Sequence, residues 1–164
     1  MSLSAGLILE NDMILQNVRS AFQGIKSQDD IESINRVNVE EAEYDNRNVI
    51  LAYQAAATCM KAKYVFSPVS KLKYFNRGKK ELETLIENDK SVENIYLRLL
   101  IQLNVPRHLN YYREIDEDII FLENHLAKAQ IDLTYKRTMI KNLVSVADKK
   151  EIKDILVQIK LETS

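Results

Sequence analysis

Apolar residues recur along this chain at intervals of three and four, which is the period of an amphipathic α-helix. No competing stretch alternates apolar and polar residues as a half-buried β-strand would. The pattern therefore predicts about eight helices and no sheet. The expected helices cover about residues 7–25, a short segment from 29, then 46–66, 68–87, 91–104, 114–126, the region around 139–144, and a last segment from 148 onward.

Two prolines and one glycine mark helix boundaries and contacts. Ser67-Pro68 ends one helix and begins the next, because proline is favoured in the first turn of a helix. Pro106 disfavours helical geometry in the residue before it, so the preceding helix should stop near Asn104. Glycine lowers helix propensity by roughly 1 kcal/mol relative to alanine. We therefore expect a neighbouring backbone to cross close to Gly78.

The same spacing predicts which side chains face inward. The first helix should bury Leu7, Ile14, Val18, Phe22 and Ile25, and the helix at 68–87 should bury Leu72, Phe75, Gly78, Leu82, Leu85 and Ile86. The helix at 114–126 should bury Ile115, Ile119, Leu122 and Leu126. Asp148 and Glu151 are spaced like a capping box at the start of the last helix. That helix should bury Ile152, Ile155, Leu156 and Ile159.

Composition favours an almost wholly helical single domain. The 164 residues include three glycines and two prolines, well below the roughly 12% that these two residues usually supply. A chain of this length can bury one substantial core. We expect an all-α domain over residues 1–164, with about eight helices stacked as antiparallel pairs. Its core should span 45–126, with N-terminal helices over 1–44 and a C-terminal helical pair over 127–164.

One segment carries a known repeat pattern. "GKKELETLIENDKSVENIYLRLL" resembles the junction of a tetratricopeptide repeat, where a small residue, a large apolar residue and a paired apolar step precede an Asp-Pro turn. These positions are occupied by Gly78, Leu82, Leu85, Ile86 and Asp89. Lys90 replaces the usual proline, and the Trp-x-x-Leu-Gly start is missing, so the match is to a degenerate repeat. The resemblance implies a fragment of a right-handed α-α superhelix.

A longer stretch, from Ala52 to Leu122, resembles an uncharacterised bacterial family of small helical proteins. That family shares the block "AYxxA…AKY…NP…KLKYxxKGKK" followed by "RFL…Q.N.P.FLGY…EDKKFI". The matching positions are Tyr53, Ala62, Lys63, Tyr64, Pro68, Lys71, Leu72, Lys73, Tyr74, Gly78, Lys79, Lys80, Arg98, Gln102, Asn104, Pro106, Leu109, Tyr111, Glu117 and Asp118. The departures are Ser67, His108, Asn110 and Ile119-Ile120. The resemblance implies no particular reaction, although similar proteins often begin with an export signal.

Charge is distributed unevenly although the net charge is only −1. Residues 28–45 hold seven acids and one base, whereas 46–80 hold eight bases and no acid. Either neighbouring helices attract each other, or the basic segment faces an anionic partner. Lys73, Arg77 and Lys80 are spaced to form one outward cationic stripe. The near-zero net charge and the flanking acids argue against a nucleic-acid partner.

The sequence is compatible with more than one cellular compartment. No stretch approaches the roughly 18 apolar residues of a transmembrane helix, so we expect no membrane insertion. The start, "MSLSAGLILEND", lacks the basic region and the length of a signal peptide. "MSL" is typical of an expression-tag remnant. If a leader was removed, the protein is periplasmic or exported; otherwise it is cytoplasmic.

Common catalytic and cofactor motifs are missing from the sequence. The only histidines are His108 and His125, and Cys59 is the only cysteine, so no zinc site or Cys-His nucleophile is indicated. Cys59 lies among alanines, so we expect its side chain to be buried in the packing between helices. Glu114 and Asp116–Asp118 crowd a helix N-terminus, where acids stabilise the helix dipole; a carboxylate metal site is the alternative. We expect no cofactor and no enzyme activity.

The segment from Asn104 to Arg113 has two interpretations. Arg107, His108, Tyr111 and Tyr112 are residue types that anchor interfaces. Alternatively, Tyr111 and Leu109 fold back onto the helices as a packing plug. If the helices stack as repeats, this loop and the surface of the helix at 68–87 are expected on one side of the molecule.

The preferred interpretation is a non-enzymatic module that binds a protein or an acidic peptide through a basic, aromatic surface. The candidate residues are Lys71, Lys73, Tyr74, Arg77, Lys80, Arg107, His108, Tyr111 and Tyr112. The alternative is a small helical ligand-binding protein or enzyme that uses His108, Tyr111 and nearby carboxylates, which requires a concave pocket around His108. A homo-oligomer is compatible with either.

Overall fold

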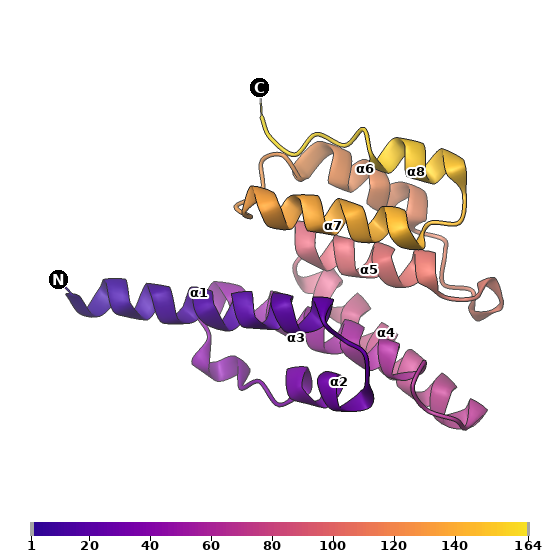
Figure 1. The fold of residues 1–164 in the computed structure, drawn as a ribbon, viewed down its shortest axis with the longest axis horizontal. Helices are drawn as coiled ribbons and strands as arrows, with labels where there is room; N and C mark the ends of the chain where they lie inside the picture. Colours follow the sequence, from indigo (N-terminus) through magenta and orange to yellow (C-terminus); the bar gives the residue numbers. More distant parts are fainter. Residues whose placement is uncertain (1, 164) are drawn as a thin grey trace. The chain divides into compact units, whose positions relative to one another are not determined.

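The computed structural model describes residues 2–163 of the chain, with side chains from Met13 onward. Over this range the chain forms eight α-helices and two short 3-10 helices, and no strand, which confirms the expected all-α class (Figure 1). The α-helices are α1 (Ser2–Gln23), α2 (Gln28–Asn35), α3 (Tyr44–Lys61), α4 (Pro68–Asn88), α5 (Val92–Asn104), α6 (Ile115–His125), α7 (Leu133–Val146) and α8 (Lys150–Leu156). The 3-10 helices are η1 (Val39–Glu41) and η2 (Arg107–Leu109).

The chain divides into two compact units, and each is described by itself. Unit 1 ends at Asp89 and contains α1 to α4, and unit 2 begins at Lys90 and contains α5 to α8. The predicted core at 45–126 extends across this boundary. The groups on α4 and on the 104–113 loop that sequence reasoning combined into one surface therefore belong to different units.

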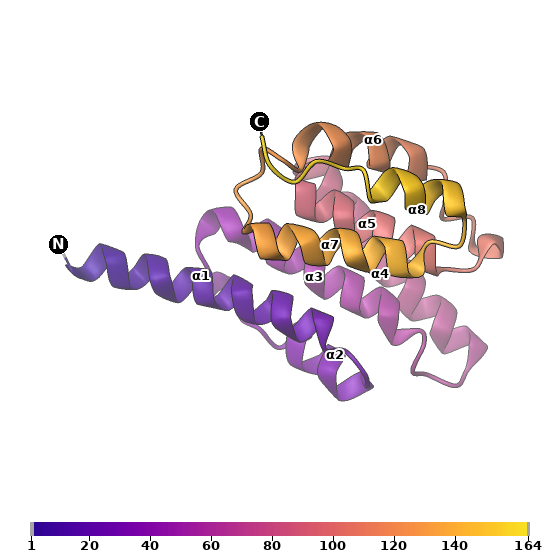
Figure 2. The ribbon, with the colours of Figure 1, turned by 45° about the horizontal axis from the view of Figure 1, so that its top comes forward.

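Unit 1 is built around α3. α1 and α2 pack against each other and against α3, and α4 packs on α3 (Figure 2). Val18 and Phe22 of α1 are buried as expected, and the Phe22 ring meets the Tyr53 ring edge-on at 5.2 Å between centroids. Leu7 lies outside the residues whose side chains are described.

α3 and α4 run in opposite directions. Near the start of α3, Asn48 donates a hydrogen bond to the carbonyl of Leu85, near the end of α4, at 3.4 Å. Near the end of α3, the Cys59 thiol lies 3.6 Å from the carbonyl of Phe75, near the start of α4. Four alanines in the middle of α3 are buried, and such small side chains let helices approach closely: Ala52, Ala55, Ala56 and Ala57.

Gly78 is the point of closest approach between α3 and α4. A Cβ atom at this position would lie 2.5 Å from the Ala55 carbonyl oxygen and 2.6 Å from the Cys59 backbone nitrogen. Two helix backbones meet here with no room for a side chain. The predicted backbone crossing at Gly78 is confirmed.

Four details of the predicted helices are wrong. Leu72 is 49% exposed, because α3 ends at Lys61 rather than near residue 66 and the first turns of α4 extend past it. Ile155 is 41% exposed, because the buried line of α8 follows Leu156. Asp148 does not cap α8, whose N-cap is Lys149 with no side-chain hydrogen bond.

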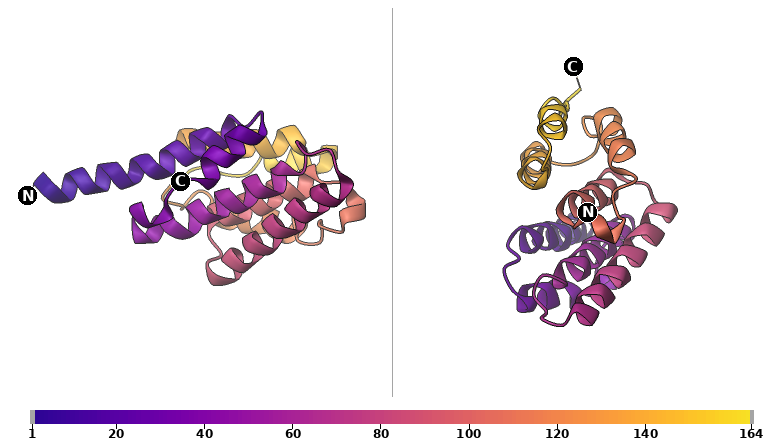
Figure 3. Two further views of the ribbon diagram at one scale, coloured as in Figure 1. Left: turned by 90° about the horizontal axis from the view of Figure 1, so that it is seen from below. Right: turned by 90° about the vertical axis from the view of Figure 1, so that its right-hand side faces the viewer.

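Unit 2 is an up-and-down arrangement of four helices. α5 packs between α6 and α7, and α8 packs on α7. α5 and α7 run one way while α6 and α8 run the other (Figure 1), and Figure 3 includes a view along the helices. Ser91 caps α5 through its hydroxyl, which accepts a hydrogen bond from the Asn94 backbone, and α5 ends at Asn104, as expected.

α5 is buried on every side. All ten residues from Glu93 to Gln102 are buried, including the polar side chains of Glu93, Asn94, Arg98 and Gln102. Buried polar groups are tolerated only where hydrogen bonds replace lost water. The packing of unit 2 therefore depends on a polar network as well as on apolar contacts.

Candidate functional site

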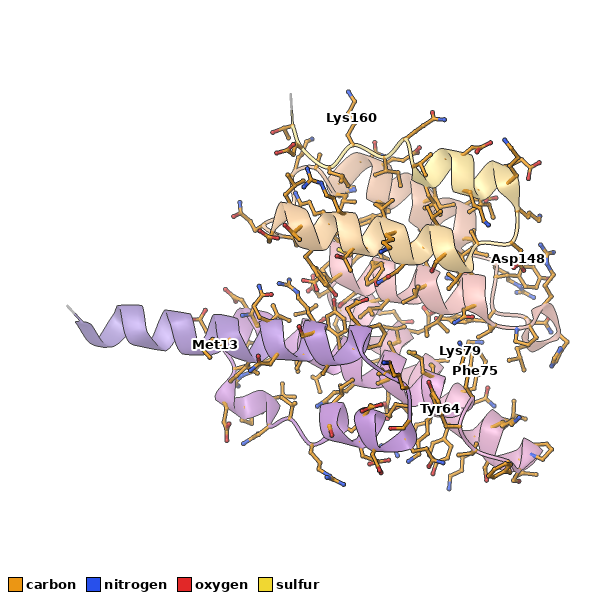
Figure 4. All side chains as sticks on the ribbon, viewed as in Figure 1. Met13, Tyr64, Phe75, Lys79, Asp148 and Lys160 are labelled. Atoms are coloured by element: carbon orange, nitrogen blue, oxygen red, sulfur yellow. The ribbon has the colours of Figure 1, made fainter. Side chains whose placement is uncertain are left out.

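Three of the predicted cationic residues, Lys73, Arg77 and Lys80, lie on the outer face of α4 and are exposed, and we call this set the α4 ridge. Lys71 is also exposed, but it lies four residues before the buried Phe75, on the other side of the helix. Arg77 donates a hydrogen bond from Nε to Glu81 at 3.0 Å, and this pairing raises the pKa of the guanidinium. Figure 4 shows the side chains along α4, where Phe75 and Lys79 are labelled. The ridge is therefore accessible to a partner at its lysines.

An open groove lies beside the ridge, between α3 and α4. Its volume is about 540 Å³. Leu51 and Leu85 supply apolar lining, and the charged lining comes from Arg77, Lys80 and Glu81. Sequence reasoning identified the two cations but not the groove, because the groove combines residues of two helices.

Part of the charge asymmetry is satisfied within unit 1. Lys61 of the basic segment bonds Glu32 of the acidic segment, and this hydrogen bond lowers the pKa of Glu32 and raises that of Lys61. Arg47 pairs with Glu40 at 2.8 Å. The acidic and basic segments therefore do attract each other on this side of the unit.

Tyr74 is the aromatic residue that α4 contributes to the predicted surface. It is half-buried, and the Lys61 amine lies 4.6 Å from the centre of its ring. Cation–π contact of this kind fixes the ring against α3. Tyr74 therefore packs at the edge of the α3–α4 hairpin, and its part in partner binding stays a prediction.

Cys59 is buried in the α3–α4 contact, as predicted. Burial raises the pKa of its thiol to about 12. A thiolate is the reactive form of cysteine. Cys59 is therefore structural.

The residues of the 104–113 loop differ in which of the two interpretations they support. Tyr111 is only 3% exposed, which matches the packing plug, and Leu109 is half-buried. His108 and Tyr112 are exposed, and the Arg107 guanidinium lies 5.5 Å from the centre of the Tyr112 ring. The chain turns sharply after η2, where Asn110 adopts φ 53° in the left-handed region that asparagine tolerates.

A small pocket lies beside this loop, wholly within unit 2. Its volume is about 140 Å³, and Gln102, Arg107, Tyr112, Asp148 and Lys149 are among the residues that line it. Figure 4 labels Asp148, in the turn between α7 and α8. Of the two residues named for the ligand-binding alternative, Tyr111 lines this pocket and His108 does not.

A buried ionic network was missed by sequence reasoning. Asp118 of α6 is completely buried and accepts two hydrogen bonds from Arg98 of α5, at 2.9 and 2.5 Å, and one from Gln102 at 3.1 Å. Sequence reasoning had grouped Asp118 with the acids of the helix N-terminus. The signal was its position, three residues after Ile115 and four before Leu122, on the inward face of the helix.

Over the residues that the structure describes, no three His, Cys, Asp or Glu side chains are grouped as metal ligands would be. In that same part of the chain, no helix has the length and hydropathy needed to span a bilayer.

Comparison of the chain with models of protein families, with curated proteins and with solved structures found no match. The resemblances to a tetratricopeptide repeat and to a bacterial helical family therefore stay predictions from the sequence.

Proposed function

We propose that the protein is a non-enzymatic interaction module that binds an acidic peptide segment along α4. The observation that carries the proposal is the groove between α3 and α4, where apolar lining from Leu51 and Leu85 lies beside the cations Arg77 and Lys80. An apolar floor with a cationic border suits a peptide in which carboxylates flank an apolar side chain.

The two kinds of contact have different roles. The apolar side chain supplies most of the binding free energy by displacing water from the lining leucines. The carboxylates select the partner and its orientation by pairing with the cations of the ridge. Because Arg77 is already paired with Glu81, Lys73 and Lys80 are the ridge cations that a partner meets without breaking an ion pair.

The proposal includes the repeat-like architecture of the α3–α4 hairpin. We infer that the α3–α4 hairpin acts as a degenerate tetratricopeptide-like unit. Its support is the close approach of α3 at Gly78, the position of the small residue in the repeat pattern. Stacked repeats of this kind form extended concave surfaces that bind other molecules.

Charge reversal on the ridge tests this function. Lys73→Glu/Lys80→Glu changes two exposed lysines that lie seven residues apart on α4. The matched control, Lys128→Glu/Lys141→Glu, makes the same change in net charge at two exposed lysines of unit 2. The probe is a fluorescent peptide with aspartates around a central leucine, and its affinity is measured by anisotropy.

We expect the ridge variant to lose at least about tenfold in affinity, since two charge contacts become repulsive. The control variant should bind the peptide as the wild type does. Equal losses of peptide affinity in both variants would show that the change in net charge alone weakens binding. If the wild type bound a peptide with lysines in place of the aspartates equally well, the ridge would not be the surface that selects acidic peptides.

A further inference from the structure

We propose that residues 66–73, which we call the α4 tip, dock the protein on the surface of an anionic lipid bilayer. The segment comprises the residue before the N-cap of α4, the N-cap Ser67 and the first turns of the helix. It is a second binding surface, which shares only Lys73 with the α4 ridge. Docking of this kind takes place within the headgroup region and needs no helix that spans the bilayer.

The α4 tip is exposed to solvent on all sides. Seven of its eight residues are exposed, and Ser70 is half-buried. The reason is that α3 ends at Lys61, so the start of α4 lacks the partner that covers the helix from Phe75 onward. Figures 1 and 2 show this end of α4 extending beyond α1 and α2 of the same unit. The tip is therefore convex, and its residues are not part of the lining of the groove between α3 and α4.

Three large apolar side chains lie on this projecting segment. Phe66 is 99% exposed, Val69 78% and Leu72 49%. The residue before an N-cap often packs on the fourth residue of the helix. Here that residue is Lys71, so Phe66 finds no apolar partner in its own helix. Contiguous apolar residues on a surface mark a contact with another molecule or with a membrane.

Cations lie on both sides of the apolar side chains. Val69 and Leu72 are three residues apart and share one face of α4. Lys71 and Lys73 project about 100° to either side of Leu72, because each residue turns an α-helix by that angle. Neither lysine is paired with a carboxylate in the part of the chain that the structure describes. Their long stems can follow the apolar side chains while the ammonium groups reach lipid phosphates.

This combination favours a bilayer over other anionic partners. A bilayer accepts projecting side chains without a complementary pocket, whereas a stable protein interface takes about 20–30 residues from each partner. Nucleic acid would pair with the lysines through its phosphates but has little use for Val69 and Leu72. The net charge of −1 does not oppose binding, because charges more than about 8 Å away are screened at physiological salt.

Vesicle co-sedimentation of the full-length protein tests the proposal. The vesicles are either phosphatidylcholine alone or a mixture in which about a third of the lipid is phosphatidylserine. We expect at least about tenfold tighter binding to the anionic vesicles, since each lysine near the surface contributes roughly fivefold. Added salt should weaken this binding.

Removal of the apolar side chains tests their share. Phe66→Ser/Val69→Ser should weaken binding to the anionic vesicles at least about tenfold, because both side chains lose their burial in the headgroup region. The matched control, Ile120→Ser/Val157→Ser, removes two exposed apolar side chains of unit 2 and should bind as the wild type does. Phe66→Ser/Val69→Ser should also keep its affinity for the acidic peptide, so this test and that of the α4 ridge can fail separately.

Removal of the charges tests the second contribution. Lys71→Gln/Lys73→Gln should weaken binding to the anionic vesicles at least about tenfold and reduce its dependence on salt. Lys128→Gln/Lys141→Gln makes the same change in net charge at exposed positions of unit 2 and should have little effect.

A tryptophan reporter locates the contact. The chain contains no tryptophan, so Phe66→Trp introduces a single indole at the α4 tip. Its emission should move to shorter wavelength with anionic vesicles, because the ring enters the interface between headgroups and acyl chains. Tyr44→Trp is the control, since Tyr44 is 82% exposed at the first residue of α3, at the other end of the α3–α4 hairpin. Its emission should not change.

Equal binding to both kinds of vesicle, or no binding to either, would overturn the proposal. So would equal emission shifts in Phe66→Trp and Tyr44→Trp. Sedimentation velocity without lipid covers the remaining alternative. If the wild type self-associates and Phe66→Ser/Val69→Ser abolishes this association, the α4 tip contacts a second copy of the chain and the proposal is wrong.

Discussion

Single residues set how closely the helices approach. Ala55, Cys59 and Gly78 bring the backbones of α3 and α4 together, and a Cβ at Gly78 would lie 2.5 Å from the Ala55 carbonyl oxygen. The sequence indicated this crossing because glycine is otherwise disfavoured inside a helix. It gave no signal that Leu51 would be 40% exposed and would line the groove between α3 and α4.

Gly78→Ala should destabilise the protein although alanine is the better helix former. The gain in propensity is about 1 kcal/mol, while forcing helices apart in a packed core costs about 1–3 kcal/mol and here meets rigid backbone. Urea denaturation measures the change in unfolding free energy. Gly24→Ala is the control, since its Cβ would meet its nearest atoms at 3.6 Å or more. A Gly78→Ala variant as stable as Gly24→Ala would contradict the close crossing.

Cys59 should be unreactive in the folded protein. Its thiol is buried and its pKa is raised to about 12, so almost no thiolate is present near neutral pH. A colorimetric thiol reagent at mildly alkaline pH should therefore label the denatured protein fully and the native protein only at the rate of unfolding. Rapid labelling of the native protein would contradict the packing of α3 on α4.

At the scale of elements, polar side chains join the helices that apolar packing brings together. Arg98 and Gln102 of α5 meet Asp118 of α6, and buried Lys136 of α7 donates to the carbonyls of Ala127 and Leu161 at 3.0 and 3.2 Å. Helix periodicity predicts that such positions face inward. It cannot predict their partners, because the partner is set by the rotation of the neighbouring helix.

Two adjacent carboxylates of α6 provide a matched test of burial. Asp118→Asn should cost about 3–5 kcal/mol of unfolding free energy, because it removes the negative charge that accepts two hydrogen bonds from the buried guanidinium of Arg98. Glu117→Gln should change stability little, since Glu117 and its partner Lys90 are both exposed to solvent. Chemical denaturation of the two variants compares them directly. Similar stabilities would show that Asp118 is not buried with Arg98.

The link between α2 and α3 should make stability depend on pH. The hydrogen bond from Lys61 holds the pKa of Glu32 below its ordinary value of 4.5. A lowered folded-state pKa means that this stabilisation is present above pH 4.5 and is lost as the pH falls through the folded pKa. Glu32→Gln should therefore lose less stability than the wild type on acidification. Lys61→Gln should likewise make the unfolding free energy less dependent on pH. The same pH dependence in all three proteins would contradict the link between Glu32 and Lys61.

At the scale of the whole molecule, the all-α class and most helix boundaries followed from the sequence, because helix formers, capping residues and prolines act locally. Ser67, Ser91 and Pro106 act as predicted. The division into two units at Asp89 could not be predicted from the sequence, since apolar residues recur at helical spacing on both sides of a short turn there. The groove and the pocket could not be predicted either, because each combines residues from separate helices or loops.

A charge-swap experiment tests the proposed role of the α4 ridge most directly. Two peptides with the same central leucine, one with flanking aspartates and one with flanking lysines, are titrated against the wild type and Lys73→Glu/Lys80→Glu. We expect the wild type to prefer the acidic peptide and the variant to prefer the basic one, since the apolar groove is unchanged while the charges beside it are reversed. The same preference in both proteins would contradict binding at the ridge.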